Sequence, residues 1–192
     1  MAHILNRKSR AFVILLSSLV ASLALSGCSE SPRQQANQDI ESANEEISAH
    51  NELYGEARAT YEEARGSTQE QSEGTTQSRS VSDARQTMQE ARSRLQQARD
   101  EISGIRDLDV SEELMEYSRT LDGALEAQIR AEQREIDFYE LAEEDPALED
   151  NRERAIGILD EAENAYEEAE EGYEEAAEIG NSNPQMAAPD SD

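Results

Sequence analysis

The sequence predicts an all-α protein, an elongated antiparallel bundle of four long helices. Small and apolar residues recur at alternating spacings of three and four over most of the chain, and Gly-, Pro- or Ser-containing breaks separate these stretches. Such spacing aligns the residues along one seam of a helix with a 3.5-residue repeat. High charge and few aromatic residues can also indicate disorder, but the regular seams favour packed helices.

The first helix is expected at about residues 32–65. Ser31 is a candidate N-cap, Pro32 suits the first helical position, and Gln34 can reach back to the cap. The stretch at 66–80 contains no aliphatic residue and predicts a flexible loop. The seam of the first helix comprises Ala36, Ile40, Ala43, Ile47, His50, Tyr54, Ala57, Tyr61 and Ala64.

The second helix is expected at about 81–104 and the third at about 110–144, with Asp109 as a candidate cap. The third apolar set advances by consecutive fours, which predicts a seam that drifts around the helix. The second seam comprises Val81, Ala84, Met88, Ala91, Leu95, Ala98, Ile102 and Ile105. The third comprises Leu114, Tyr117, Leu121, Leu125, Ile129, Ile136 and Tyr139.

The fourth helix is expected at about 146–179, with Asp145 as its cap and Pro146 at its first position. So short a connection predicts that the third and fourth helices are antiparallel neighbours. Residues 181–192 show no pattern and predict a disordered tail. The fourth seam comprises Ala155, Leu159, Ala162, Tyr166, Ala169, Tyr173 and Ala176.

In an up-down bundle at 32–180, the fourth helix would lie beside the first, and a helix of about 33 residues would be roughly 50 Å long. Two loosely joined hairpins, divided before Val110, are the alternative. Large side chains would face small or aliphatic ones at each level: Tyr166 and Tyr173 opposite Ile47 and Ile40, and Tyr54 and Tyr61 opposite Leu159 and Ala155.

The first 28 residues have the pattern of an export signal. Three cationic residues, Arg7, Lys8 and Arg10, precede an apolar run at 11–25, and the run ends in Leu25-Ser26-Gly27-Cys28. This ending resembles the lipobox of bacterial lipoproteins. The resemblance implies that the Cys28 thiol receives a diacylglycerol, that the chain is cut before Cys28, and that the new amino terminus is acylated.

We therefore expect a signal peptide at 1–27 and a lipidated tether at 28–31. A membrane-spanning helix needs about 20 apolar residues, so the run at 11–25 makes spanning the weaker reading. Ordinary signal-peptidase cleavage that leaves Cys28 unmodified is the competing reading. Lipidation would place the protein outside the cytoplasm, on the cell membrane, or on the outer membrane of a cell with two.

The processed chain would be strongly acidic. It would keep 165 residues, one domain by size, with 14 arginines and no lysine against 44 acidic residues, a formal charge of 14 − 44 = −30. That charge repels nucleic-acid phosphates and anionic lipid headgroups. We expect no nucleic-acid partner and membrane contact only through the lipid on Cys28.

No pattern of catalytic or metal-ligating residues is found. His50 would be the only histidine after processing, and its seam position predicts a hydrogen-bonded core residue, with pH sensing as a further possibility. Asp107-Leu108-Asp109 starts like a calcium loop, but Gly104 precedes it and Ser118 occupies the position of the bidentate glutamate. We expect no catalytic residue, metal or cofactor.

The expected function is that of a lipid-anchored spacer or scaffold that contacts another envelope protein. Phe138 and Tyr139 are adjacent, so we expect one to face the core and the other to be available to a partner. The alternative is an extracytoplasmic binding module or sensor for a small ligand or peptide, and an enzyme comes third. A cavity lined by Tyr117, Tyr166 or Tyr173 would favour binding, whereas a filled core with an exposed apolar strip would favour docking.

Overall fold

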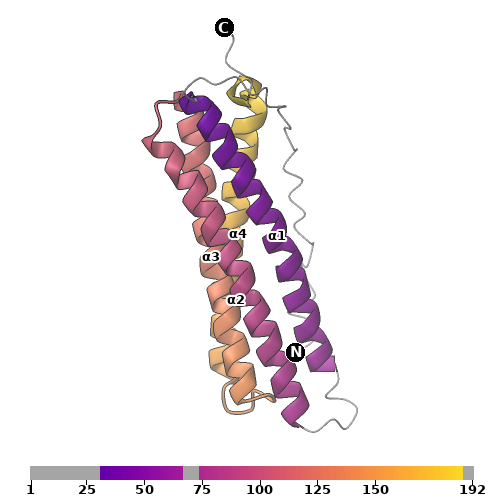
Figure 1. Ribbon diagram of the computed structural model, residues 1–192. Helices are drawn as coiled ribbons and strands as arrows, with labels where there is room; N and C mark the ends of the chain where they lie inside the picture. The colour runs from indigo at the N-terminus through magenta and orange to yellow at the C-terminus, as the bar shows by residue number, and fades with distance from the viewer. Residues whose placement is uncertain (1–30, 67–73, 188–192) are drawn as a thin grey trace.

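A computed structural model describes residues 31–66 and 74–187, and it confirms the all-α class. Four helices run alternately up and down a rod (Figure 1). None of the helices in the described part is long and apolar enough to cross a membrane. The helices are α1 (Pro32–Gly66), α2 (Gly74–Gly104), α3 (Glu112–Glu144) and α4 (Arg152–Ser182), with 3-10 turns η2 (Ile105–Asp107) and η3 (Pro184–Ala187).

The start of α1 confirms the expected capping box. The backbone amide of Gln34 donates to Ser31 Oγ at 3.2 Å, and the backbone amide of Ser31 donates to Gln34 Oε1 at 3.1 Å. Two orphan amides at the helix end are thereby satisfied. Every residue of the predicted α2 seam is buried, and so are most of those on α1.

The start of α2 differs from the prediction. The helix begins at Gly74, so the expected loop at 66–80 is wrong from residue 74 onward, and 67–73 lie outside the described residues. The prediction relied on the first aliphatic residue, Val81. A helix can extend beyond its apolar seam into solvent, and the polar residues at 74–80 include no proline to stop it.

The start of α3 also differs. Ser111, and not Asp109, is its N-cap, and the Ser111 hydroxyl accepts from the Leu114 amide at 3.4 Å. Leu108 and Val110 pack against the core, and the Val110 amide donates to the Leu108 carbonyl at 3.1 Å, which forms a tight turn with Asp109 exposed. The helix can only begin after this segment.

The prediction that Asp145 caps a helix starting at Pro146 is wrong. Asp145 ends α3, where its amide donates to Leu141 O at 2.9 Å. Its carboxylate accepts from the backbone amides of Glu149 and Asp150, at 3.3 and 3.1 Å, and so organises a seven-residue connection, 145–151. Helix α4 begins only at Arg152.

The expected disordered tail at 181–192 is wrong over its first seven residues. Helix α4 continues to Ser182, η3 follows, and Met186 is buried in the core. The carbonyl of Met186 accepts from Arg33 Nε at 3.3 Å, which joins the end of the described chain to the start of α1. Residues 188–192 lie outside the described part.

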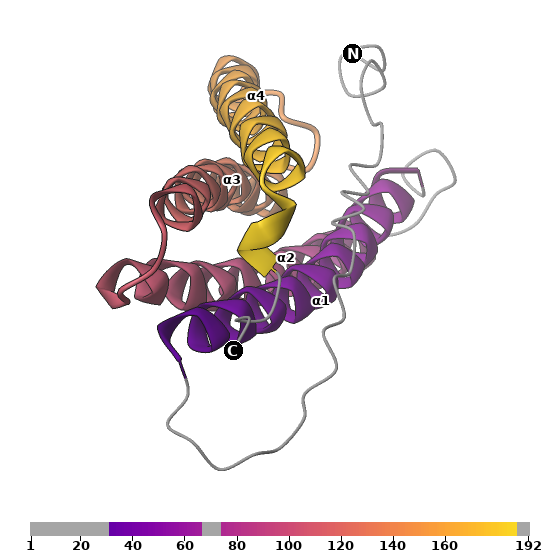
Figure 2. The same ribbon diagram turned by 90° about the horizontal axis from the view of Figure 1, so that it is seen from above.

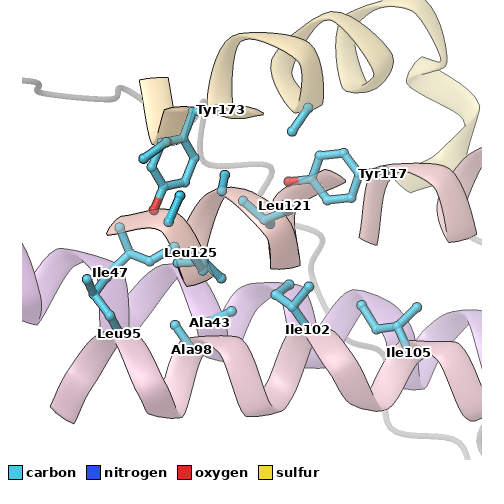
Figure 3. Close-up of a cluster of buried hydrophobic side chains, with 14 of the residues drawn as sticks. Ala43, Ile47, Leu95, Ala98, Ile102, Ile105, Tyr117, Leu121, Leu125 and Tyr173 are labelled. Carbon is cyan, nitrogen blue, oxygen red and sulfur yellow. The ribbon is translucent and has the colours of Figure 1, made fainter. Parts of the chain in front are cut away.

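The helices form one bundle, because a single buried cluster combines residues from all four (Figure 3). Helices that are consecutive in the chain pack backbone to backbone, whereas α1 and α4 share little direct backbone contact (Figure 2). The side of the rod between α1 and α4 is therefore closed mainly by side chains.

The predicted alignment of α4 along α1 is wrong by one heptad. Tyr166 meets Tyr54 edge to face, with ring centroids 6.3 Å apart, so an aromatic residue faces another aromatic residue. Tyr173 lies in the cluster that contains Ile47, and Ile40 packs against the same cluster. The cause is the connection at 145–151. Because α4 starts six residues later than expected, each of its residues lies closer to the C-terminal end of α1 than predicted.

Candidate functional site

A group of polar side chains lies inside the bundle, halfway along the rod. We call it the polar cluster. Its members come from three helices. The side chains of His50 and Glu132 are the most deeply buried of them, at 1% and 0% exposed. Burying a polar group costs folding free energy unless the group is hydrogen-bonded. This cluster therefore differs from the apolar remainder of the core. It comprises His50, Tyr54 and Arg58 of α1, Gln128, Glu132 and Glu135 of α3, and Tyr166 and Tyr173 of α4.

The centre of the polar cluster is the contact between His50 and Glu132, which crosses the bundle from α1 to α3. His50 Nε2 lies 2.6 Å from Glu132 Oε1, and His50 Nδ1 lies 3.1 Å from Asn51 Oδ1. Gln128 Nε2 donates to the same Glu132 oxygen at 3.2 Å, and the Tyr173 hydroxyl donates to Gln128 Oε1 at 2.6 Å. The second oxygen, Glu132 Oε2, is buried without a hydrogen-bond partner.

The other half of the polar cluster surrounds Glu135. The Tyr166 hydroxyl donates to Glu135 Oε2 at 2.8 Å, and Arg58 Nη1 lies 3.9 Å from Glu135 Oε1. Arg58 also donates to the Tyr54 hydroxyl at 2.9 Å. A tyrosine from α1 and another from α4 therefore converge on one buried carboxylate of α3.

Burial shifts the pKa values of this half. Desolvation raises the pKa of the Glu135 carboxyl, although Arg58 and the Tyr166 hydroxyl oppose the shift. Burial likewise raises the pKa values of Tyr54 and Tyr166, and the nearby Glu135 charge raises them further. The cluster thus favours neutral tyrosines and resists ionisation of Glu135.

We expect Glu135→Gln to stabilise the protein more at pH 7 than at pH 4. Because its pKa is raised in the folded state, Glu135 contributes stability that is fully present below the ordinary carboxyl pKa, about 4.3. That contribution is lost as the pH rises through the raised value. Glutamine keeps the acceptor for Tyr166 and does not ionise.

The measurement is the melting temperature of both proteins by circular dichroism between about pH 4 and pH 7. Glu163→Gln, at an exposed position of α4, is the control and should leave the pH dependence unchanged. A difference between Glu135→Gln and the parent that shrinks as the pH rises would contradict the assignment.

Sequence reasoning missed the acidic members of the polar cluster. It followed Leu121 and Leu125 to the apolar Ile129, and so it described a drifting seam. Continuing the alternation of three and four from Leu125 leads instead to residues 128, 132, 135 and 139, which are the positions that turn inward. His50, in contrast, is confirmed as a hydrogen-bonded core residue.

The expected exposure of Phe138 or Tyr139 to a partner is wrong, because both are buried. Tyr61 of α1 stacks on Tyr139, with centroids 4.8 Å apart, and meets Phe138 edge to face at 5.6 Å. Adjacent residues point in different directions around a helix. Because α3 packs against both α2 and α4, both directions are covered and both residues are buried.

The described surface includes a small and a larger pocket. One, of about 40 Å³, lies beside the polar cluster between α1, α3 and α4, and is lined by Arg58, Tyr61, Glu135 and Leu159 among others. A space this small holds only a few water molecules. The other, of about 390 Å³, lies at the end of the rod between Arg33 and Met186. Tyr117, Tyr166 and Tyr173 line neither pocket.

Within the described ranges, no group of three or more histidine, cysteine or acidic side chains is arranged to hold a metal ion. The lipobox residues Leu25, Ser26, Gly27 and Cys28 lie outside the described ranges. Comparisons with protein-family models, with curated proteins and with solved structures give no significant match.

Proposed function

We propose that this protein is a lipid-anchored component of a bacterial envelope, and that its acidic helical rod acts as a spacer or a scaffold for another envelope protein without catalysing a reaction. The observation that carries the proposal is the filled core. Two buried clusters run along the rod, and the pocket beside the polar cluster is small, about 40 Å³. A rod with a filled core can hold two objects apart and offer its outer surface to a partner, as a spacer or scaffold requires.

The outer face of α4 supports a scaffold that binds through charge. Among the described large hydrophobic side chains, only Ile156 is exposed, at 38%, so an apolar docking strip does not account for partner binding. After Arg154, α4 carries no basic residue. Its exposed acidic side chains include Glu163, Glu167, Glu170, Glu171, Glu174, Glu175 and Glu178.

The interior of the rod does not favour the alternative, a binding module for a small ligand or peptide, because its pocket is far below the 300–1,000 Å³ that is usual for ligand sites. The pocket at the end of the rod, at about 390 Å³, is within that range and is where this alternative would place a ligand. A neighbouring protein of basic surface is the partner that the charge of α4 suits best.

We expect Cys28→Ser to release the protein from membranes as a soluble and still helical rod, because two or more acyl chains are needed for stable anchoring and this change removes their attachment point. The measurement is fractionation of cells, with circular dichroism of the released protein. Ser29→Ala, one residue further, is the matched control and should stay with the membrane.

Retention of Cys28→Ser with its signal removed would overturn the lipid anchor. The scaffold is tested separately by proximity labelling from the C-terminal tail of the anchored protein. Enrichment of one envelope protein over a free lipoprotein control supports the scaffold, and uniform labelling of all neighbours contradicts it.

A further inference from the structure

We infer that the His50–Glu132 contact is a proton-dependent clamp that holds α1 against α3, and that loss of its proton loosens the side of the rod between α1 and α4. The clamp is independent of the proposed scaffold role. It rests on the burial and geometry of the polar cluster.

The first step is the hydrogen-bond arrangement of His50. Both ring nitrogens face oxygen atoms, Asn51 Oδ1 at 3.1 Å and Glu132 Oε1 at 2.6 Å. A ring that donates from both nitrogens is the imidazolium form. Gln128 Nε2 lies 3.5 Å from His50 Nε2 and donates to Glu132 Oε1 at the shorter distance of 3.2 Å, which leaves the 2.6 Å contact with Glu132 as the principal one of His50 Nε2.

The second step is what the proton does for Glu132. Its side chain is 0% exposed, and Oε2 has no hydrogen-bond partner. A buried carboxylate is tolerated when a cation is paired with it and is strongly unfavourable when the partner charge is removed. When His50 releases its proton to solvent, the carboxylate keeps only the neutral donors of His50 and Gln128.

The third step is which side of the rod yields. Helices α1 and α3 lie diagonally across the bundle, and the polar cluster makes their described ion pairs. Helix α1 is packed backbone to backbone on α2 but not on α4. Water can therefore reach Glu132 most readily if α1 moves away from α4, which also separates Tyr54 from Tyr166.

Other charged groups near His50 do not replace the clamp. The register set by the Glu46–Arg94 ion pair brings Glu90 of α2 level with His50, and Glu90 is exposed. The neighbouring Ala91 is buried and Arg92 is half-buried. On α3, Glu135 adds negative charge that Arg58 offsets. The remaining groups that contact His50 are Asn51 and Tyr54 of α1 and Gln128 of α3. Tyr166 and Tyr173 of α4 interact with its partner, Glu132.

The test follows the proton and the opening in the same sample. Nuclear magnetic resonance of the full chain with ¹⁵N-labelled histidine reports the charge of the His50 ring, and His50→Gln identifies its signals, since His3 is the only other histidine. Hydrogen exchange of the α1 amides around residue 50 reports opening. After correction for base catalysis, exchange should rise by up to roughly tenfold per pH unit while the closed rod still holds the His50 proton and the opened rod does not, because opening then releases one proton. The rise should level off at the pH where the ring titrates in the closed rod.

Two variants separate the clamp from general loss of packing. Glu132→Gln keeps the size and an acceptor for His50 without a charge, and so it should abolish the pH-dependent rise. Glu135→Gln removes the neighbouring carboxyl and should retain the rise. A parent protein without a rise, a rise that continues beyond the pH at which the His50 ring titrates, or a rise that persists in Glu132→Gln would overturn the clamp. If Glu132→Gln does not fold, the match between ring titration and exchange in the parent decides the question.

Discussion

Raising the pH above about 10 should unfold this protein in one cooperative step. Its six tyrosines all have raised pKa values, and burial is the main cause at each. A raised tyrosine pKa means that the folded state retains a proton that the unfolded state releases. The stability present below the ordinary tyrosine pKa is therefore lost as the pH rises towards the folded value.

The expected effect is large because several tyrosines act together. Each contributes about 1.4 kcal/mol per pH unit, so the four most strongly shifted give roughly 5 kcal/mol per unit, which is comparable to the whole stability of many domains. Those four are Tyr54, Tyr139, Tyr166 and Tyr173. The transition should fall within about two pH units above 10.

Tyrosinate absorbance and circular dichroism, recorded together, check this expectation, and the two curves should coincide. Tyr139→Phe removes one titrating group from the core and should lower the slope of the free energy of unfolding against pH by about 1.4 kcal/mol per unit. Tyrosines that ionise near their ordinary pKa while the helices remain intact would contradict this expectation.

We expect Gly172→Ala to destabilise the bundle by about 1–3 kcal/mol, the usual cost of overpacking. A Cβ at Gly172 would lie 2.9 Å from the Cβ of Ala124 and 3.2 Å from its Cα. Because one of these atoms belongs to the backbone of α3, α3 and α4 would have to move apart. This is the place where glycine permits the close approach of the two helices.

Gly157→Ala is the matched control on the same helix. No atom lies within 4 Å of a Cβ placed there, so the substitution should stabilise α4 by about 0.5–1 kcal/mol through the higher helix propensity of alanine. Thermal unfolding measures both, and each kcal/mol shifts the melting temperature by about 2–4 °C. Melting temperatures that rise in both variants would show that α3 and α4 are not held this close.

The seams were predictable from sequence because a helix that buries one side repeats its small and apolar residues every three or four positions. The connections were less predictable, since their hydrogen bonds come from side chains such as Asp145 that suit either a helix start or a turn. The error in the connection also caused an error in the alignment of α4 along α1, because the length of 145–151 decides which residue of α1 lies opposite each tyrosine of α4.

The polar cluster escaped prediction for a different reason. Glutamate on an acidic chain is normally solvated, so the inward position of Glu132 is recognisable only if spacing is given more weight than residue type. His50 was placed correctly because it occurs once on a regular seam. Its partner could not be named, since the contact depends on how two diagonal helices are aligned.

The hydrogen bond between Arg33 and Met186 has a consequence for how neighbours of this protein can be found. It holds the beginning and the end of the described chain at one tip of the rod, so with a lipid on Cys28 a label on the C-terminal tail samples the vicinity of the bilayer. The connection at 145–151 lies at the opposite tip, about 45 Å away for the 31 residues of α4. Under the proposed lipid anchor, labels placed at the two tips would thus report on neighbours at two different distances from the bilayer.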